Sequence, residues 1–313
     1  MAMNGADEVV VRRPLDSAAA LAYLVLHAVP GVERVRVEDD ATAGLVERLV
    51  RGPAGPVRLT VHVRPDELRL VTSRPGPDLV AVAERWFGVG DDLAAVVAHL
   101  TAVPDDPLAR LVRERPHLRV PGHVDAFEAA AQTVLGQQVS LAAARTFTGR
   151  LAAALGEPHD DLTQFPDATR VAAADPDALR TVLRVTSARS RTLVALARAC
   201  VDGLELRPGA DPDATRAGLL AVPGIGPWTA DYLALRAFGD RDAFPAGDLV
   251  LRRAMAVPDA RAAHAHARAW SPWRAYAAQH LWTAAAYARV TPAAATSPAR
   301  PRRPADDPRA PRA

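Results

Sequence analysis

Residues 220–239 read LAVPGIGPWTADYLALRAFG, and most of the interpretation of this chain depends on them. Pro-Gly-Ile-Gly-Pro lies there between two segments with helical periodicity, so we predict a helix, a tight turn and a second helix. Pro227 suits the first turn of a helix, and Gly224 and Gly226 allow positive φ and close approach of the backbone. The turn should therefore expose unpaired N–H groups at the positive end of the second helix, which suits an anion such as phosphate.

A turn of this kind can also do no more than connect two helices. Pro-Gly-Ile-Gly alone leaves the two interpretations evenly balanced. The pattern here is longer: an apolar residue, three residues of any type, Pro-Gly-Ile-Gly, two more residues and Thr-Ala. It matches the helix-hairpin-helix element, which binds one phosphate of the DNA backbone without reading the base sequence. We therefore predict a phosphate-binding hairpin that uses Gly224, Gly226 and Thr229.

Large aromatic side chains accompany the hairpin. Trp228 and Tyr232 are four residues apart, so they share one face of the second predicted helix. Aromatic residues at this spacing are often ordinary core. In the predicted helix 272–289, however, Trp282 projects among alanines on the side opposite the main apolar stripe. A large ring in that place indicates a second buried face or the wall of a cleft, and we favour the cleft.

Asp248 follows the hairpin in the segment Phe-Pro-Ala-Gly-Asp-Leu-Val-Leu-Arg-Arg. An aspartate after glycine and before an apolar run is typically a helix N-cap, and capping alone explains it. Capping does not exclude catalysis. The helix dipole would favour the ionised carboxylate, which is the form needed opposite a developing cation.

Composition narrows the classes of protein. The 313 residues can form two or three domains with a sizeable core. The single cysteine, Cys200, excludes a disulfide framework, a cysteine zinc site and an iron–sulfur cluster within this chain, and we interpret it as core. All 38 basic residues are arginine, so no lysine can form a Schiff base. We find no signal-peptide pattern or membrane-spanning run, and expect a cytoplasmic protein.

Two secondary-structure patterns divide the chain. Residues 57–63 alternate apolar and polar, and a second short run at 68–71 follows a turn, which predicts an antiparallel hairpin. Helical patterns at 17–28 and 78–87 flank it, so the first 100 residues should form a small α+β domain. From Asp91 onward we expect no strands. Helices are predicted at about 92–101, 125–135, 141–155, 176–183, 187–202, 213–221, 227–238, 249–256, 259–269 and 272–289, with starts at Ser140, Asp248 and Ser271 and stops at Gly156, Gly203 and Gly239.

Together these residues resemble the helix-hairpin-helix DNA glycosylases, and within them the DNA-3-methyladenine glycosylase II (AlkA-type) enzymes. The resemblance is carried by PGIGPWTADYLALRAFG with an aspartate twenty residues after its tryptophan. It extends to RPHLRVPGHVDAFEAAAQTVLGQQVSLAAA (115–144) and WSPWRAYAAQHLW (270–282), and covers residues 15–290.

The resemblance implies an α+β protein whose small N-terminal antiparallel-sheet domain precedes an all-α helix-hairpin-helix glycosylase core. The N-terminal domain would span 1–101 and the core 102–290. Two helical subdomains would form the core, one from 102–125 with 241–290 and the other from 126–240. A disordered tail rich in proline, alanine and arginine would occupy 291–313.

The family's activity would make this chain a monofunctional glycosylase and a monomer at the nucleoid, with no membrane partner. It would remove alkylated bases, such as 3-methyladenine and 7-methylguanine, from double-stranded DNA without a catalytic cofactor and so begin base excision repair. Carried onto this sequence, Asp248 is the catalytic carboxylate. The base pocket would consist of Trp228, Tyr232, Trp282 and Tyr23, the gap-filling loop of Gln137 and Gln138, and a structural Na⁺ or K⁺ ion would bind the carbonyls of Leu220, Val222 and Ile225.

The residues support this chemistry independently. A base must leave the stack before its glycosidic bond can be reached, and N-alkylated purines are often cationic, so electron-rich rings can bind them. An ionised Asp248 can stabilise the oxocarbenium-like sugar and orient water. Strand-cutting relatives place a lysine where Trp228 stands, so the absence of lysine excludes that lyase route.

Two positions depart from the family, and other interpretations stay open. Gln138 stands where some relatives have a leucine wedge, and Thr283 stands where a second aromatic residue occurs. A non-catalytic protein that binds damaged DNA would keep the same hairpin and pocket, but an intact Asp248 argues against it. A purely structural hairpin module leaves the aromatic residues unexplained. Metal hydrolysis has no support, because His264 and His266 would face different ways on a helix.

Overall fold

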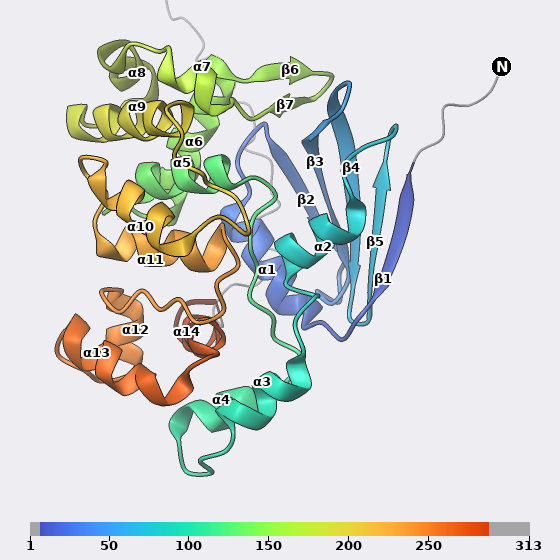
Figure 1. The fold of residues 1–313 in the computed structure, drawn as a ribbon. Coiled ribbons are helices and arrows are strands. Elements are labelled where there is room, and N and C mark those ends of the chain that lie inside the picture. The colour runs from blue at the N-terminus through green and yellow to red at the C-terminus, as the bar shows by residue number, and fades with distance from the viewer. Residues whose placement is uncertain (1–6, 288–313) are drawn as a thin grey trace, which may run out of the picture.

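A computed structural model describes residues 7–287, so the predicted tail at 291–313 lies outside the described residues. Its first layer is a five-stranded antiparallel sheet in the order β1-β5-β4-β3-β2 (Figure 1). Helices α1 and α2 pack on one face of it, around a shared apolar cluster. The elements of this layer are β1 (Glu8–Arg12), α1 (Ser17–His27), β2 (Glu33–Val37), β3 (Gly44–Gly52), β4 (Gly55–Arg64), β5 (Glu67–Thr72) and α2 (Leu79–Phe87).

The predicted hairpin is confirmed as β4 and β5, which pair with Val61 opposite Leu70. The prediction did not extend far enough, because β1, β2 and β3 belong to the same sheet. In β3 the pattern is obscured by Arg48, a charged residue that is buried on the same face of the strand as Val46 and Val50. Alternation fails as a signal where a charge points into the interior.

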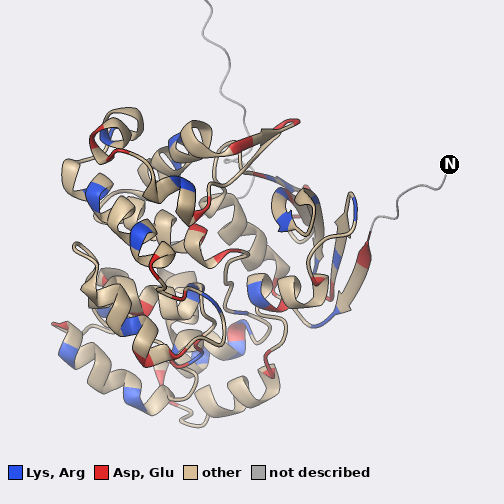
Figure 2. Ribbon diagram, turned by 45° about the horizontal axis from the view of Figure 1, so that its top comes forward, with Lys and Arg blue, Asp and Glu red and all other residues tan. Residues whose placement is uncertain are grey.

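The remainder of the described chain is mainly helical, which confirms the predicted class of an N-terminal sheet followed by a helical core. Basic and acidic residues are interspersed over these helices (Figure 2). The elements are α3 (Leu93–Leu100), α4 (Pro107–Glu114), α5 (Ala126–Gly136), α6 (Leu141–Leu155), β6 (Glu157–His159), β7 (Leu162–Gln164), α7 (Ala168–Ala172), α8 (Pro176–Leu183), α9 (Ser187–Val201), α10 (Pro212–Ala221), α11 (Pro227–Arg236), α12 (Leu249–Ala254), α13 (Ala260–Ala267), a 3₁₀ turn (Arg268–Trp270), α14 (Arg274–Trp282) and a π-helical turn (Thr283–Tyr287).

Several expectations for this part were wrong. The strands β6 and β7 form a short hairpin after Asp91, where no strands were expected, and α4 and α7 were not predicted. These elements are short, so each gives only a weak periodic signal. Ser271 does not start the last helix. Its hydroxyl donates to Asp242 at 2.9 Å, and α14 begins after Trp273.

Two apolar clusters fill the helical part. The first contains residues of α5, α6, α8 and α9, and the second contains residues of α3, α4, α13 and α14. Helix α11 contributes to both, with Leu233 in the first cluster and Leu235 in the second. The predicted boundary at residue 101 leaves α3 with the sheet, although Val96 and Leu100 pack in the second cluster. No helix within residues 7–287 is long and apolar enough to cross a membrane.

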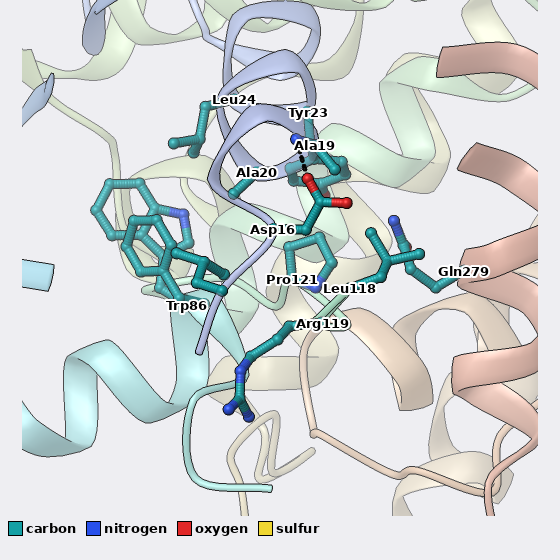
Figure 3. A pocket seen from close by; sticks show the side chains of 12 residues that line it. Asp16, Ala19, Ala20, Tyr23, Leu24, Trp86, Leu118, Arg119, Pro121 and Gln279 are labelled. Carbon is teal, nitrogen blue, oxygen red and sulfur yellow. Dashed lines mark hydrogen bonds between the residues drawn. The ribbon is translucent and has the colours of Figure 1, made fainter. Parts of the chain in front are cut away.

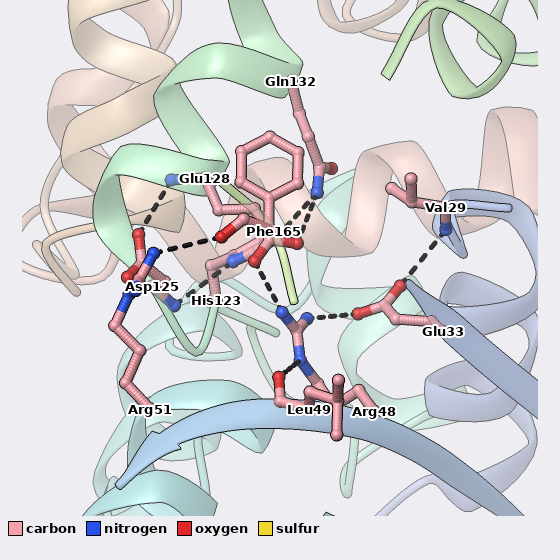
Figure 4. A network of polar contacts seen from close by, with 10 residues as sticks. All are labelled: Val29, Glu33, Arg48, Leu49, Arg51, His123, Asp125, Glu128, Gln132 and Phe165. Carbon is pink, nitrogen blue, oxygen red and sulfur yellow. Dashed lines mark hydrogen bonds and ion pairs between the residues drawn. The ribbon is translucent and has the colours of Figure 1, made fainter. Parts of the chain in front are cut away.

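A buried polar network joins the sheet to the helices (Figure 4). Arg48 of β3 is 1% exposed and forms ion pairs with Glu33 and with Glu128 of α5, the latter at 2.5 Å. Burial alone would lower the pKa of Arg48, but the carboxylates of Glu128 and Glu33 raise it, so the guanidinium stays charged. Gln132 donates to Glu128 at 3.1 Å, and its carbonyl oxygen points away from that carboxylate.

Candidate active site

A cavity of about 380 Å³ lies where α1, α5, α6, α11 and the start of α12 meet. It brings together side chains from both the first layer and the helical core. Its lining consists of Tyr23, His27, Val29, His123, Ala129, Gln132, Thr133, Gly136, Val139, Leu141, Ala144, Arg145, Thr148, Trp228, Tyr232, Arg236, Asp248, Val250 and Trp282. All four residues predicted for the base pocket, and Asp248, therefore border one cavity.

A second cavity, beside α1, measures about 20 Å³ (Figure 3). Leu15, Trp86 and Arg119 are among the residues that line it. This space is of the order needed for one water molecule and is far too small for a nucleobase. Two further hollows, of about 400 and 660 Å³, contain neither Asp248 nor the predicted aromatic residues, so the cavity of about 380 Å³ is the candidate site.

Asp248 is held by four N–H donors. Its Oδ1 accepts from the backbone N–H groups of Val250 at 2.9 Å and Leu251 at 3.0 Å, so the predicted N-cap of α12 is confirmed. The indole Nε1 of Trp282 also donates to Oδ1, at 3.2 Å. The indole Nε1 of Trp228 donates to the other oxygen, Oδ2, at 3.1 Å. Among the described residues, Oδ1 thus accepts three hydrogen bonds and Oδ2 one.

The three predicted aromatic residues form one wall of the cavity. Trp228 and Tyr232 are stacked, with centroids 5.2 Å apart and planes at 17°, because residues four apart on α11 lie one above the other. Tyr232 meets Trp282 edge to face at 6.0 Å. Every residue from 275 to 282 is buried, so α14 has the second buried face that its sequence suggested, and Trp282 lies on the cavity wall.

Tyr23 reaches the cavity from the first layer. Its ring stacks on that of His27, one turn later in α1, at 4.0 Å. His27 Nδ1 lies 2.9 Å from the carbonyl of Tyr23, and burial lowers the pKa of His27 to about 4. Burial likewise lowers the pKa of His123, which also lines the cavity, to about 4. Both imidazoles are therefore neutral near pH 7.

Arg236 is the residue that sequence reasoning missed. It lies one turn past Tyr232, is 3% exposed, and holds its guanidinium carbon 4.9 Å from the Tyr23 ring, 5.8 Å from the Tyr232 ring and 5.1 Å from the Trp282 ring. The spacing of residues 228, 232 and 236 places all three on one helix face. That regular spacing was the available signal.

The hairpin connects α10 to α11 through two glycines with different roles. Gly224 has φ +90°, and a Cβ there would lie 2.2 Å from Thr192 Oγ1, so this position needs glycine for both reasons. The positive φ that glycine allows is not used at Gly226, whose φ is −108°. Gly226 is the N-cap of α11, and no side chain of residues 7–287 caps that helix. The N–H groups of its first turn are thus left without a side-chain acceptor.

Of the remaining predicted loop residues, Thr229 and Gln137 contact the hairpin inside the protein, whereas Gln138 is exposed to solvent. Thr229 is 3% exposed, and its Oγ1 accepts from Gln137 Nε2 at 3.1 Å. The same Gln137 nitrogen donates to the carbonyl of Gly224 at 3.1 Å, so Gln137 ties the end of α5 to the hairpin. Gln138 is exposed and has φ +54°. Of the two glutamines, Gln138 is the one whose side chain is presented outward.

Comparison with known proteins places this fold and site in a family. Residues 8–125 match the AlkA N-terminal domain, and residues 131–266 match the HhH-GPD superfamily base excision DNA repair protein model. The chain therefore belongs to the HhH-GPD superfamily of base excision DNA repair proteins. Because the AlkA N-terminal domain precedes that core, it is an AlkA-type member.

Relatives and solved structures agree with this assignment. The probable bifunctional transcriptional activator/DNA repair enzyme AlkA of Mycobacterium tuberculosis is 41% identical over 287 residues, which cover 87% of this chain and 55% of the relative. DNA-3-methyladenine glycosylase 2 of Escherichia coli is 40% identical over 179 residues, covering 56% of this chain and 63% of the relative. The chain thus spans 55% and 63% of the length of these two relatives. A 3-methyladenine DNA-glycosylase structure from Archaeoglobus fulgidus shares the fold, with a TM-score of 0.73 at 17% identity over 91% of this chain and 100% of that one.

Proposed function

We propose that the protein is a monofunctional DNA glycosylase that hydrolyses the N-glycosidic bond of alkylated bases in double-stranded DNA and so begins base excision repair. One observation carries the proposal. The Asp248 carboxylate accepts hydrogen bonds from two tryptophans, Trp228 and Trp282, that also line a cavity large enough to receive a base. An anion and electron-rich rings are thereby joined in one site. The names of the Escherichia coli and Mycobacterium tuberculosis relatives support the same activity.

DNA would be held by the uncapped N-terminus of α11. The N–H groups after Gly226 and the positive end of the helix suit one backbone phosphate. This contact reads no base sequence, so it positions the duplex without choosing the lesion. Gln138, exposed at the turn between α5 and α6, would fill the gap left by the extruded nucleotide.

The carbonyls of Leu220, Val222 and Ile225 would hold the structural Na⁺ or K⁺ ion in the hairpin. A purely oxygen donor set suits a hard cation. The Val222 carbonyl already accepts the N–H of Ile225 at 3.1 Å, so its second lone pair is the one available to the ion. The ion would brace the turn and would supply no chemistry to the reaction.

The extruded base would stack against the aromatic wall formed by Trp228, Tyr232 and Trp282. Removing a base from the duplex costs a few kcal/mol, and least for a damaged, poorly paired base. Stacking and cation–π attraction to electron-rich rings, about 0.5–2 kcal/mol each, offset part of that cost. Damaged bases are thus selected by ease of extrusion together with fit to the wall.

Hydrolysis would take place beside Asp248. As the bond between sugar and base breaks, its electron pair leaves with the base and the sugar becomes oxocarbenium-like, which the carboxylate stabilises. Oδ2 accepts one hydrogen bond from the described residues, so it has a lone pair left to orient the attacking water. The water oxygen bonds to the sugar carbon and keeps one of its protons as the new hydroxyl group. Its other proton passes to solvent when the departing base was cationic, and to the base when it was neutral. The chain contains no lysine to continue to strand cleavage.

The activity is tested by adding the protein to methylated duplex DNA and identifying the released bases by mass spectrometry. The wild-type protein should be a monomer that releases 3-methyladenine and 7-methylguanine and leaves abasic sites in the DNA. The strand should break only when alkali is added. Asp248→Asn should release both bases far more slowly than wild type. Oxidised guanine as the main product would contradict the alkylated-base assignment, and tight DNA binding without any release would favour the damage-binding alternative. In the cell the site of action would be the nucleoid, in the cytoplasm.

A further inference from the structure

The charges on the cavity wall do not match a site that selects cationic bases by charge alone. Two guanidinium groups, Arg145 and Arg236, and one carboxylate, Asp248, are the ionic groups among the described residues that line it. The two histidines of the lining add no charge near pH 7, because burial lowers the pKa of each to about 4. A cationic base would therefore enter a site that already carries an excess of positive charge.

Arg236 cannot move away when a base enters. Its NH1 donates to the carbonyl of Pro121 at 2.7 Å, and its NH2 donates to Gln279 Oε1 at 2.9 Å. Gln279 is itself buried and donates to Thr283 Oγ1 at 3.3 Å. The guanidinium is thus held by two hydrogen bonds and is buried at the cavity wall.

The position of this charge affects the same rings that the base would use. The guanidinium carbon lies 5.1 Å from the Trp282 ring and 5.8 Å from the Tyr232 ring, within the range of cation–π contacts. The same rings can also attract a cationic base, but the Arg236 guanidinium repels that base. Repulsion between two such charges across a protein site corresponds to a factor on the order of ten in binding. A neutral base that stacks on the same rings meets no such repulsion.

Resting on the function proposed above, we propose that Arg236 sets the charge selectivity of the base pocket. Its buried guanidinium opposes the attraction that the aromatic wall and Asp248 exert on cationic bases. Neutral damaged purines are consequently processed alongside cationic ones, since extrusion and stacking, which both classes share, decide entry. Arg236 is a specificity-determining residue and takes no part in bond breaking.

Gln279→Glu tests this with little change of shape. Glutamate has the size of glutamine, and its carboxylate would pair with the guanidinium that Gln279 now contacts at 2.9 Å, cancelling its charge. The measurement is kcat/KM for duplexes carrying 7-methylguanine, a cationic lesion, and hypoxanthine, a neutral one. The ratio of cationic to neutral should rise about tenfold. In the matched control Gln279→Met, which removes the hydrogen bond but adds no charge, the ratio should stay within about twofold of wild type.

A second readout separates this proposal from the proposed function. Quenching of tryptophan fluorescence gives Kd for the free bases 7,9-dimethylguanine (cationic at pH 6) and 9-methylguanine (neutral), with no cleavage required. Gln279→Glu should tighten the cationic base about tenfold relative to the neutral one. If wild type releases no base but this shift occurs, the glycosylase proposal fails and the role of Arg236 stands. The proposed role of Arg236 is overturned if Gln279→Glu has a wild-type circular dichroism spectrum and leaves the ratio of cationic to neutral base unchanged in both assays. Should Gln279→Glu not fold, Arg236→Met must give the same direction.

Discussion

The helices α11 and α12 begin about twenty residues apart and treat their N-termini in opposite ways. At α11 the N-cap is Gly226, which has no side chain, so no side chain of the described residues accepts the first N–H groups, and an anion from outside the protein would do so. At α12 the N-cap is Asp248, whose carboxylate accepts the N–H groups of Val250 and Leu251. Every helix N-terminus attracts negative charge. One of these helices would receive that charge from DNA, while the other carries it within its own chain.

The consequence of this difference concerns what each site can do. An anion held in the protein is rigid, and the indoles of Trp228 and Trp282 reinforce it from the cavity side. An anion supplied by DNA can be exchanged, so the α11 site can release its ligand and bind again elsewhere.

Replacing Asp248 should separate capping from catalysis. Asparagine caps a helix as well as aspartate but has no charge, so Asp248→Asn should lower kcat by about 10²–10³-fold at unchanged stability. Asp248→Ala loses the cap as well and should lower the free energy of unfolding by about 1 kcal/mol. Single-turnover kinetics and thermal unfolding measure the two quantities. Full activity in the asparagine variant would remove Asp248 from the mechanism.

Gly226→Asp should give α11 the arrangement of α12. A Cβ at this position would meet no described atom within 4 Å, so the carboxylate can be accommodated and can cap the helix. Stability should rise by a few tenths of a kcal/mol, while DNA affinity at 0.1 M salt falls by on the order of tenfold and the salt dependence weakens by about one phosphate contact. Gly226→Asn is the uncharged control and should lose less affinity. Unchanged DNA binding in both variants would mean that the phosphate lies elsewhere.

Trp228→Phe should weaken the support of the Asp248 carboxylate while keeping an aromatic ring. It removes the donor at 3.1 Å from Oδ2, and hydrogen bonds to charged groups contribute about 1.5–3 kcal/mol, so kcat should fall about tenfold or more. Trp282→Phe is the matched control. Its effect should be smaller, because Oδ1 keeps both backbone donors. The reverse order would show that Oδ1 is the reactive oxygen.

Gln138→Ala should have the smallest effect. The side chain is exposed, so folding stability should be unchanged, but the gap in the duplex loses a hydrogen-bonding filler. KM should rise about fivefold, the equivalent of one neutral hydrogen bond, with kcat nearly unchanged. Gln137→Ala should instead reduce thermal stability, since Gln137 bridges Gly224 and Thr229. Equal loss of stability in both variants would contradict the division between inner and outer glutamines.

Local signals explain what the sequence predicted. The hairpin depends on glycines and a proline, the Asp248 cap on its neighbours, and β4 and β5 on simple alternation, so each could be recognised without the fold. The spacing of Arg236 from Tyr232 shows only which helix face it shares, so this local signal could not give Arg236 a role. Its ring contacts come from α1, α11 and α14, and only the tertiary structure places Tyr23 and Trp282 on either side of it. The same holds for the indole contacts to Asp248, which join residues from three helices.

The ion pair between Arg48 and Glu128 limits how this protein can be recombined (Figure 4). A chimera whose sheet lacked an arginine at the position of Arg48 would leave the buried Glu128, 1% exposed, without its counter-charge, at a cost of about 3–5 kcal/mol. Much of the stability of a small domain would be lost. The helical half is therefore not a portable module. A chimera made with another sheet would have to bring an arginine to the position of Arg48, or replace Glu128 at the same time.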